Sequence, residues 1–158
     1  MTGRREAVRT WASISVGDEL TPLELPMTAT RIVAGAIASR DFMPVHHDRD
    51  YANSQGAPDI FMNILSTNGY CSRFLTDWAG PEAMIRRLAI RLGVPVFPNS
   101  ILRFTGTVTG TLTAEAPGAS GADAPGAATE GLVEVEFRAT NDLGDHAVGT
   151  ATLSLPLD

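Results

Sequence analysis

The sequence contains a single cysteine, Cys71, among 158 residues. One cysteine excludes a disulfide within the chain, so a reducing compartment is expected. Cys71 lies in an apolar segment, which favours a buried structural thiol over a nucleophile. No segment approaches the roughly 18 apolar residues of a membrane span, and the basic segment 1–9 leads into no apolar run of a signal peptide. These absences predict a cytoplasmic protein.

Positive charge is also scarce, with 12 basic against 18 acidic residues and a net charge of −6. This balance argues against general nucleic-acid binding, which needs a basic field. Four arginines nevertheless lie close together in the sequence, and they are Arg73, Arg86, Arg87 and Arg91. Such a group is a candidate for binding the phosphates of an anionic small molecule, or for a partner interface, or is simply a solvated face.

The length and composition predict one domain over residues 1–158 with a sizeable core. Leu20–Met27, which contains two prolines, is typical of an edge-like strand. Apolar residues at helical spacing predict a helix over Thr28–Ser39 and a longer one over Asp59–Trp78, ended by Gly80. Polar residues within the longer helix predict that part of it lines a wet cavity. These residues are Asn63, Ser66, Thr67, Asn68 and Ser72.

The second half of the chain is rich in alternating apolar and polar residues, which predict strands. The predicted strands are Met84–Gly93, Ser100–Thr113, Gly131–Thr140 and His146–Leu155. Asn141–Asp145 is typical of a hairpin turn, with Gly144 at the positive-φ position. Segment 114–129 is low in large apolar residues and is expected to be a flexible Ala/Gly/Pro-rich insertion. The whole order predicts an α+β fold in which an antiparallel sheet wraps around one long helix.

The densest group of chemically active residues lies in the segment 39–52, where Asp41 and His46 flank a proline. Pro44 lacks an N–H and fixes its own φ, so it excludes a regular helix between the two residues. A turn at this point can bring the carboxylate and the imidazole side by side. Such a pair can hold one water molecule and move its proton near neutral pH. We therefore expect an enzyme.

Simpler roles exist for several residues of this segment. Asp41 alone could be a cap or a turn former, but His46 at this spacing favours catalysis. His47 is expected to be a structural or substrate-side residue, and Asp48 and Asp50 to cap the next turn or to pair with Arg49. A metal site is not expected, because adjacent histidines point apart and no further ligand lies at a familiar spacing.

The pattern Asp41-x-x-Pro44-x-His46-x-Asp48, followed by Tyr51-Ala52, resembles the hydratase motif of MaoC-like (R)-specific enoyl-CoA hydratases. Several further segments resemble one branch of that family more closely, the small catalytic subunit of a heteromeric steroid enoyl-CoA hydratase of bacterial cholesterol side-chain degradation. These segments are 40–42, 45–50, 59–61, 63–65, 76–81 and 91–95. The resemblance covers about residues 32–108 and 141–155, and it leaves out the insertion.

The resemblance implies a single hot-dog fold, in which a curved antiparallel sheet wraps a long helix. It also implies that Asp41 and His46 activate the water that adds to C3 of a trans-2-enoyl thioester, with a proton returned to C2 on the same face. A backbone N–H at the start of the long helix would polarise the thioester carbonyl. The matching positions are Met62-Asn63, or Phe61-Met62 with one alignment gap. Asn63 and Met62 are therefore expected substrate-binding residues, together with His47 on the substrate side of the motif.

The same resemblance implies a partner and no cofactor. In this branch of the family a second MaoC-like subunit provides room for the steroid, so a heterodimer or heterotetramer is expected. Water addition is redox-neutral, which predicts that no cofactor takes part. Two alternatives stay open at this point. One is a homodimeric hydratase for non-steroid acyl chains, and the other is a non-catalytic hot-dog subunit that completes a partner's site.

Overall fold

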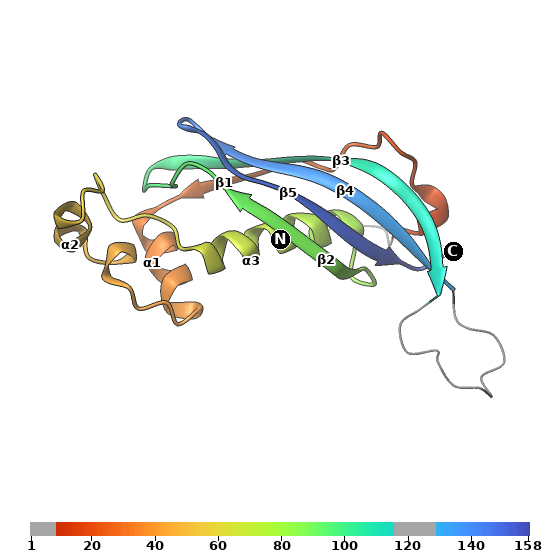
Figure 1. Cartoon of the computed structure of the whole chain (residues 1–158), viewed down its shortest axis with the longest axis horizontal. Coiled ribbons are helices and arrows are strands. Elements are labelled where there is room, and N and C mark those ends of the chain that lie inside the picture. Colours follow the sequence, from red (N-terminus) through yellow and green to blue (C-terminus); the bar gives the residue numbers. More distant parts are fainter. Residues whose placement is uncertain (1–8, 116–128) are drawn as a thin grey trace, which may run out of the picture.

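The computed structural model describes residues 9–115 and 129–158, and in it one antiparallel sheet curves around one long helix (Figure 1). The strands lie in the order β1-β3-β4-β5-β2. Their bounds are β1 Leu23–Met27, β2 Met84–Leu92, β3 Ser100–Glu115, β4 Thr129–Asn141 and β5 Gly144–Leu155. The expected α+β hot-dog arrangement is therefore confirmed, and β1 lies at an edge of the sheet as its prolines predicted.

The helix inside the sheet is α3, Ile64–Ala79. Its buried side chains recur at helical spacing, so one face packs on the sheet. They are Thr67, Cys71, Phe74, Leu75, Trp78 and Ala79. The predicted start at Asp59 is wrong, because the Asn63 side chain accepts a hydrogen bond from the Ser66 N–H and caps the helix there. The apolar residues just before Asn63 continue the helical spacing of apolar positions in the sequence, although they are not part of the helix. Gly80, with φ of 93°, ends the helix as expected.

The sheet turns one face toward α3 and the other toward solvent. In β4 the side chains of Val133, Val135 and Phe137 are buried, whereas Glu134 and Glu136 between them are exposed. This is the alternation of a strand with one buried face. Side-chain contacts join the helix to the sheet. In one of them the ring of Phe74 on α3 stacks on the ring of Phe104 on β3, with 5.6 Å between the ring centroids.

The four predicted C-terminal strands are all present, each within a few residues of its expected bounds. The hairpin between β4 and β5 turns at Gly144, whose φ of 127° is in the region that favours glycine. The predicted insertion 114–129 falls almost wholly on residues 116–128, which lie outside the described residues. Its flexibility, and a single domain over 1–158, stay predictions.

Short helical elements gather at the end of the molecule where α3 begins (Figure 1). They are α1 Ala29–Ala38, the 3-10 turn η2 Pro44–His46 and α2 Arg49–Ser54, while the 3-10 turn η1, Trp11–Ser13, lies near the N-terminus. Helix α1 was predicted from the sequence. In the structure Thr28 is its N-cap and Ser39 is its C-cap. Helix α2 was not predicted. Within the residues that the structure describes, no helix is long and apolar enough to cross a membrane.

Candidate active site

Asp41 leaves the end of α1 in a fixed position. The Asp41 N–H donates to the Ala36 carbonyl (2.9 Å) and the Arg40 N–H to the Ile37 carbonyl (3.1 Å), which is a Schellman ending. Arg40 adopts the left-handed conformation that this ending requires, with φ of 57°. The helix end thus turns the chain sharply just before Asp41, whose carboxylate points back toward the start of α3.

His46 closes the 3-10 turn that Pro44 begins. Its ring is buried, and Nδ1 lies 2.7 Å from the carbonyl oxygen of Phe61. The Phe61 ring also meets the imidazole edge to face, at 5.2 Å between centroids. Because a carbonyl oxygen only accepts, Nδ1 carries the proton and Nε2 of the neutral ring is left unprotonated. This Nε2 lies 3.4 Å from Oδ2 of Asp41.

The Asp41 carboxylate is held by two donors. The Asn63 side-chain amide donates to Oδ2 (3.0 Å), and the Met43 N–H donates to Oδ1 (3.3 Å). The Asn63 bond, and after it the Met43 bond, lower the pKa of Asp41 below its ordinary value, although burial opposes the shift. Asp41 is therefore ionised at neutral pH. Its side chain is 24% exposed, against 10% for His46, so small molecules can reach the pair.

The pair Asp41–His46 offers two proton acceptors directed at one point. A water molecule beside the pair, within hydrogen-bond distance of both Oδ2 and Nε2, can donate one hydrogen to each, which leaves its lone pairs directed outward at an electrophile. Removal of either proton gives a hydroxide-like nucleophile and a nearby acid. The geometry therefore supports the addition of water to a polarised double bond, or its removal.

The three expected substrate-binding residues lie in different environments. Asn63 is buried at the N-cap of α3, and its amide donates to both Ser39 Oγ (2.9 Å) and Asp41. Met62 is buried, and its N–H donates to the Val96 carbonyl (3.0 Å). His47 is exposed, and the described residues give its side chain no hydrogen-bond partner. The structure thus brings Asn63 to the pair and directs neither Met62 nor His47 at it.

The first turn of α3 supplies free backbone donors beside the pair. Among the described residues, no acceptor is bonded to the N–H groups of Asn63, Ile64 or Leu65. Those of Phe61 and Met62, the positions that the resemblance indicated, are bonded to the carbonyls of Val45 and Val96. Free N–H groups at a helix start carry partial positive charge and can bind a carbonyl oxygen.

The acidic residues around the pair have structural roles. Asp48 caps α2 by accepting from the Tyr51 N–H (3.0 Å), as expected. Arg49 pairs with Asp59 through two hydrogen bonds, not with Asp48 or Asp50. Over residues 9–115 and 129–158, no group of three or more His, Cys, Asp or Glu side chains has the arrangement of a metal site.

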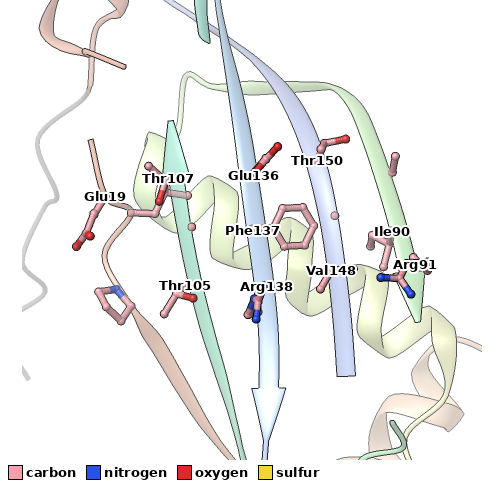
Figure 2. Close-up of a pocket in the computed structure, with 15 residues that line it drawn as sticks. Glu19, Ile90, Arg91, Thr105, Thr107, Glu136, Phe137, Arg138, Val148 and Thr150 are labelled. Carbon is pink, nitrogen blue, oxygen red and sulfur yellow. The ribbon is translucent and has the colours of Figure 1, made fainter. Parts of the chain in front are cut away.

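The clustered arginines do not converge on the candidate site. Arg73 pairs with Asp77, Arg86 pairs with Glu130, and Arg87 and Arg91 are exposed on β2. Arg91 lines an open hollow of about 740 Å³ on the solvent face of the sheet, with α3 behind the strands (Figure 2). The charged side chains that line this hollow belong to Glu19, Arg91, Glu136 and Arg138. The lining includes no histidine and no carboxylate–imidazole pair, so this hollow lacks the acid–base chemistry found at Asp41.

One contact that bears on the site, between Thr67 and His146, was not predicted from the sequence. Oγ1 of Thr67, in the first turn of α3, lies 2.9 Å from Nε2 of His146, and both side chains are buried. The sequence placed His146 at the start of a distant predicted strand, and no local pattern links positions 79 residues apart. Asn63 and Thr67 are hydrogen-bonded within the protein, and the wet cavity that was expected beside them stays a prediction.

The sequence matches the MaoC like domain over residues 13–119, which is more than half of the chain. The chain belongs to the MaoC-like family. It is 42% identical over 140 residues to the 3-oxo-4,17-pregnadiene-20-carboxyl-CoA hydratase beta subunit of Mycobacterium tuberculosis, with 89% of this chain and 95% of the relative covered.

Solved structures agree with this assignment. A chain of the ChsH1-ChsH2 complex from Mycobacterium tuberculosis superposes with a TM-score of 0.74 and 42% identity, covering 89% of this chain and 98% of that chain. The (R)-hydratase from A. caviae involved in PHA biosynthesis superposes with a TM-score of 0.71 at 21% identity, covering 91% of this chain and 98% of that chain. At that identity the second likeness supports the fold alone.

Proposed function

We propose that this MaoC-like chain is the catalytic subunit of a hydratase that adds water to a trans-2-enoyl-CoA thioester, with a steroid bearing a shortened side chain as the acyl group. The observation that carries the proposal is the Asp41–His46 pair, whose two unprotonated atoms lie 3.4 Å apart beside free helix-start N–H groups. The relative named as a pregnadiene-carboxyl-CoA hydratase subunit, at 42% identity, supports the substrate class.

The reaction follows from the positions of the groups. Water bound between Asp41 and His46 transfers one proton to the pair while its oxygen attacks C3 of the enoyl group. The electrons of the double bond move toward the thioester carbonyl, whose oxygen accepts hydrogen bonds from the free N–H groups of Ile64 and Leu65. The proton held by the pair then moves to C2, so the product is the 3-hydroxyacyl-CoA. All atoms come from water and substrate, and the proposed chemistry draws on no cofactor or metal.

Exposed apolar side chains around the site suit a bulky apolar substrate. Among the described residues, five of the ten exposed large apolar side chains belong to the end of α1, the turn after Asp41 and the first turn of α3. These five are Ile37, Phe42, Met43, Ile64 and Leu65. Apolar surface left beside a catalytic pair in an isolated chain favours an acyl group and a partner subunit that cover it together.

The proposed partner is a second MaoC-like subunit. Within residues 9–115 and 129–158, strand β2 pairs with β5 alone, so a nine-residue strand is left with one open edge. An open edge of this length can add a strand of another chain, whereas β1 at the opposite edge is five residues long and contains Pro26. The ChsH1-ChsH2 complex, which contains a structural relative of this chain, supports a heteromeric assembly.

The proposal is tested by following the loss of enoyl-thioester absorbance with two substrates, a steroid enoyl-CoA with a three-carbon side chain and a straight-chain enoyl-CoA. Each is given to the chain alone and to the chain with a larger MaoC-like subunit. We expect hydration of the steroid substrate only by the pair of subunits. Hydration of the straight-chain substrate by the chain alone would indicate a homodimeric hydratase. No hydration under any of these conditions would contradict the proposal.

A further inference from the structure

A β-bulge places His146 against the helix that carries the candidate site. The register of β4 and β5 passes from Ala139–Ala147 to Thr140–Asp145, which leaves His146 without a partner across the ladder. A bulge of this kind turns a side chain away from the regular alternation. Here both His146 and its neighbour Ala147 are buried, and the imidazole contacts the first turn of α3.

The imidazole joins two parts of the chain inside the protein. Nδ1 donates to the Val94 carbonyl (2.7 Å), so Nε2 of the neutral ring accepts from the hydroxyl of Thr67 (2.9 Å). Burial lowers the pKa of His146, which favours this neutral form. The His146 backbone carbonyl also accepts from the Gly93 N–H (2.8 Å). One bulged residue therefore ties the 93–96 segment to α3.

These contacts are connected to the Asp41 carboxylate through Asn63. Thr67 lies one helical turn after Asn63, and its N–H donates to the Asn63 carbonyl (3.1 Å). On the other side of Asn63, the Met62 N–H donates to Val96, at the end of the same 93–96 segment. The residue whose amide binds Asp41 is thus held from both sides by a framework that His146 anchors.

We infer that His146 and Thr67 are positioning residues for the proposed reaction. The bulged histidine fixes, through the Thr67 hydroxyl, the helix turn whose Asn63 amide binds Asp41. The inference rests on the proposed function, because it assigns the two residues to the geometry of that site. Neither side chain has a hydrogen bond to Asp41 or His46, so their effect on the rate passes through Asn63 and the first turn of α3.

The test replaces Thr67 by valine, which has nearly the same shape but no hydroxyl, in the assembly that shows hydratase activity. We expect kcat to fall roughly 10- to 100-fold, because small displacements of positioned groups cost this much, with little change in KM. The acid limb of the kcat–pH profile should also move to higher pH, since a displaced Asn63 stabilises the Asp41 carboxylate less. Thr67→Ser keeps the hydroxyl and should restore both values.

Two further variants make the result decisive. Thr76→Val removes a hydroxyl from the same helix far from the site, where it bonds the Ser72 carbonyl (3.0 Å), and should leave kcat and the pH profile unchanged. If Thr67→Val fails to fold because Nε2 is left unpaired, the double variant Thr67→Val/His146→Leu removes both polar groups and is assayed instead. A folded variant with wild-type kcat and acid limb would overturn the inference.

The result also separates this inference from the proposed function. Asp41→Asn is assayed in parallel. Loss of activity in Asp41→Asn together with a wild-type profile in Thr67→Val would remove only the positioning role. Full activity in Asp41→Asn would contradict the proposed function itself.

Discussion

The arrangement of single atoms decides what the Asp41–His46 pair can do. Phe61 fixes the proton of His46 on Nδ1, and Asn63 and Met43 keep Asp41 ionised, so two acceptors face each other across 3.4 Å. Asp41 would activate water less well without its two amide donors, and His46 would do so less well without the Phe61 carbonyl on Nδ1. A carboxylate that accepts amide protons stays charged, and an imidazole that donates from Nδ1 leaves Nε2 basic.

Asn63 is expected to set the pH at which activity is lost in acid. Its bond is the largest cause of the lowered pKa of Asp41, so the carboxylate stays ionised below the ordinary value of 3.8. In Asn63→Ser the serine still caps α3, but the amide donor is lost, and the pKa of Asp41 should rise. The acid limb of the kcat–pH profile should then move to higher pH. An unmoved acid limb would show that Asn63 does not control this carboxylate.

The same shift links Asp41 to stability. Because its folded pKa lies below the unfolded value, Asp41 stabilises the fold above the unfolded pKa, and this contribution is lost as pH falls through the folded pKa. The contribution should be smaller in Asn63→Ser. Chemical denaturation of both proteins at neutral pH and near pH 3 measures it, and we expect the two unfolding free energies to converge in acid. A constant difference would contradict the linkage.

Cys71 should be inert in the native protein. It is fully buried on α3, and burial raises its pKa to about 12, so almost no thiolate exists at neutral pH. A thiol reagent at pH 8 should therefore react only after denaturant is added. Rapid reaction of the folded chain would contradict the structural role that the sequence predicted for this residue.

Some of these residues could be predicted from the sequence and others could not. Asp41 and His46 were identifiable because Pro44 excludes a helix between them and forces a turn. Asn63 was placed near the substrate, but its bond to Asp41 depends on how the end of α1 meets the start of α3. His146 gave no signal, because its role depends on a β-bulge, and a bulge arises from the pairing of two strands.

Helix α1 and helix α3 lie close together because of a small residue in each. A Cβ built on Gly35 would lie 2.3 Å from Ser66 Oγ, so any side chain at position 35 would displace the Ser66 hydroxyl. The approach brings Ser39, at the end of α1, within hydrogen-bond distance of Asn63. The contact between the two helices therefore sets where Asp41 lies relative to the start of α3.

Gly35→Ala should destabilise the protein by about 1–3 kcal/mol, as overpacked sites commonly do. The buried Ser66 hydroxyl has no hydrogen-bond partner in the part of the chain that the structure describes, so Ser66→Ala alone should change the unfolding free energy little. In the double variant the oxygen that meets the new Cβ is gone, and we expect partial recovery. Thermal or urea unfolding of the four proteins measures the coupling. Simple additivity of the two changes would show that the contact is not a close one.

The bounds of these elements show where local sequence is informative. Helix α1 was predicted closely, because apolar residues recur at helical spacing, and the structure shows that Thr28 caps it. The start of α3 was misplaced, since Ile60 and Phe61 continue its apolar pattern although Asn63 caps the helix. Helix α2 was missed because six residues are too few to show a period, and only the cap at Asp48 marks its beginning.

At the scale of the whole molecule, the sheet has two edges of different character. Strand β1 is short and contains Pro26, whereas β2 is long and carries Arg86, Arg87 and Arg91. Charged side chains on an edge discourage indiscriminate pairing and leave a matched partner able to bind. The open edge of β2 and the exposed apolar side chains near Asp41 both favour a chain that completes its site with a second subunit.

Amide hydrogen exchange can distinguish the two edges. Adding the larger MaoC-like subunit should slow exchange along β2, because its free N–H groups would pair with the partner. Strand β1 serves as the internal control and should exchange at an unchanged rate. Equal protection of both edges, or of neither, would contradict the proposed role of β2 in assembly.

The most direct test of the account is the hydration rate of Asp41→Asn in the active assembly, measured by loss of enoyl-thioester absorbance. The matched control is Asp50→Asn, the same change at an exposed carboxylate in the first turn of α2. We predict that Asp41→Asn loses roughly 10²- to 10⁴-fold in kcat, the range for removal of a general base, while Asp50→Asn stays at the wild-type rate. Equal rates for the two variants would contradict the assignment of water activation to Asp41 and His46.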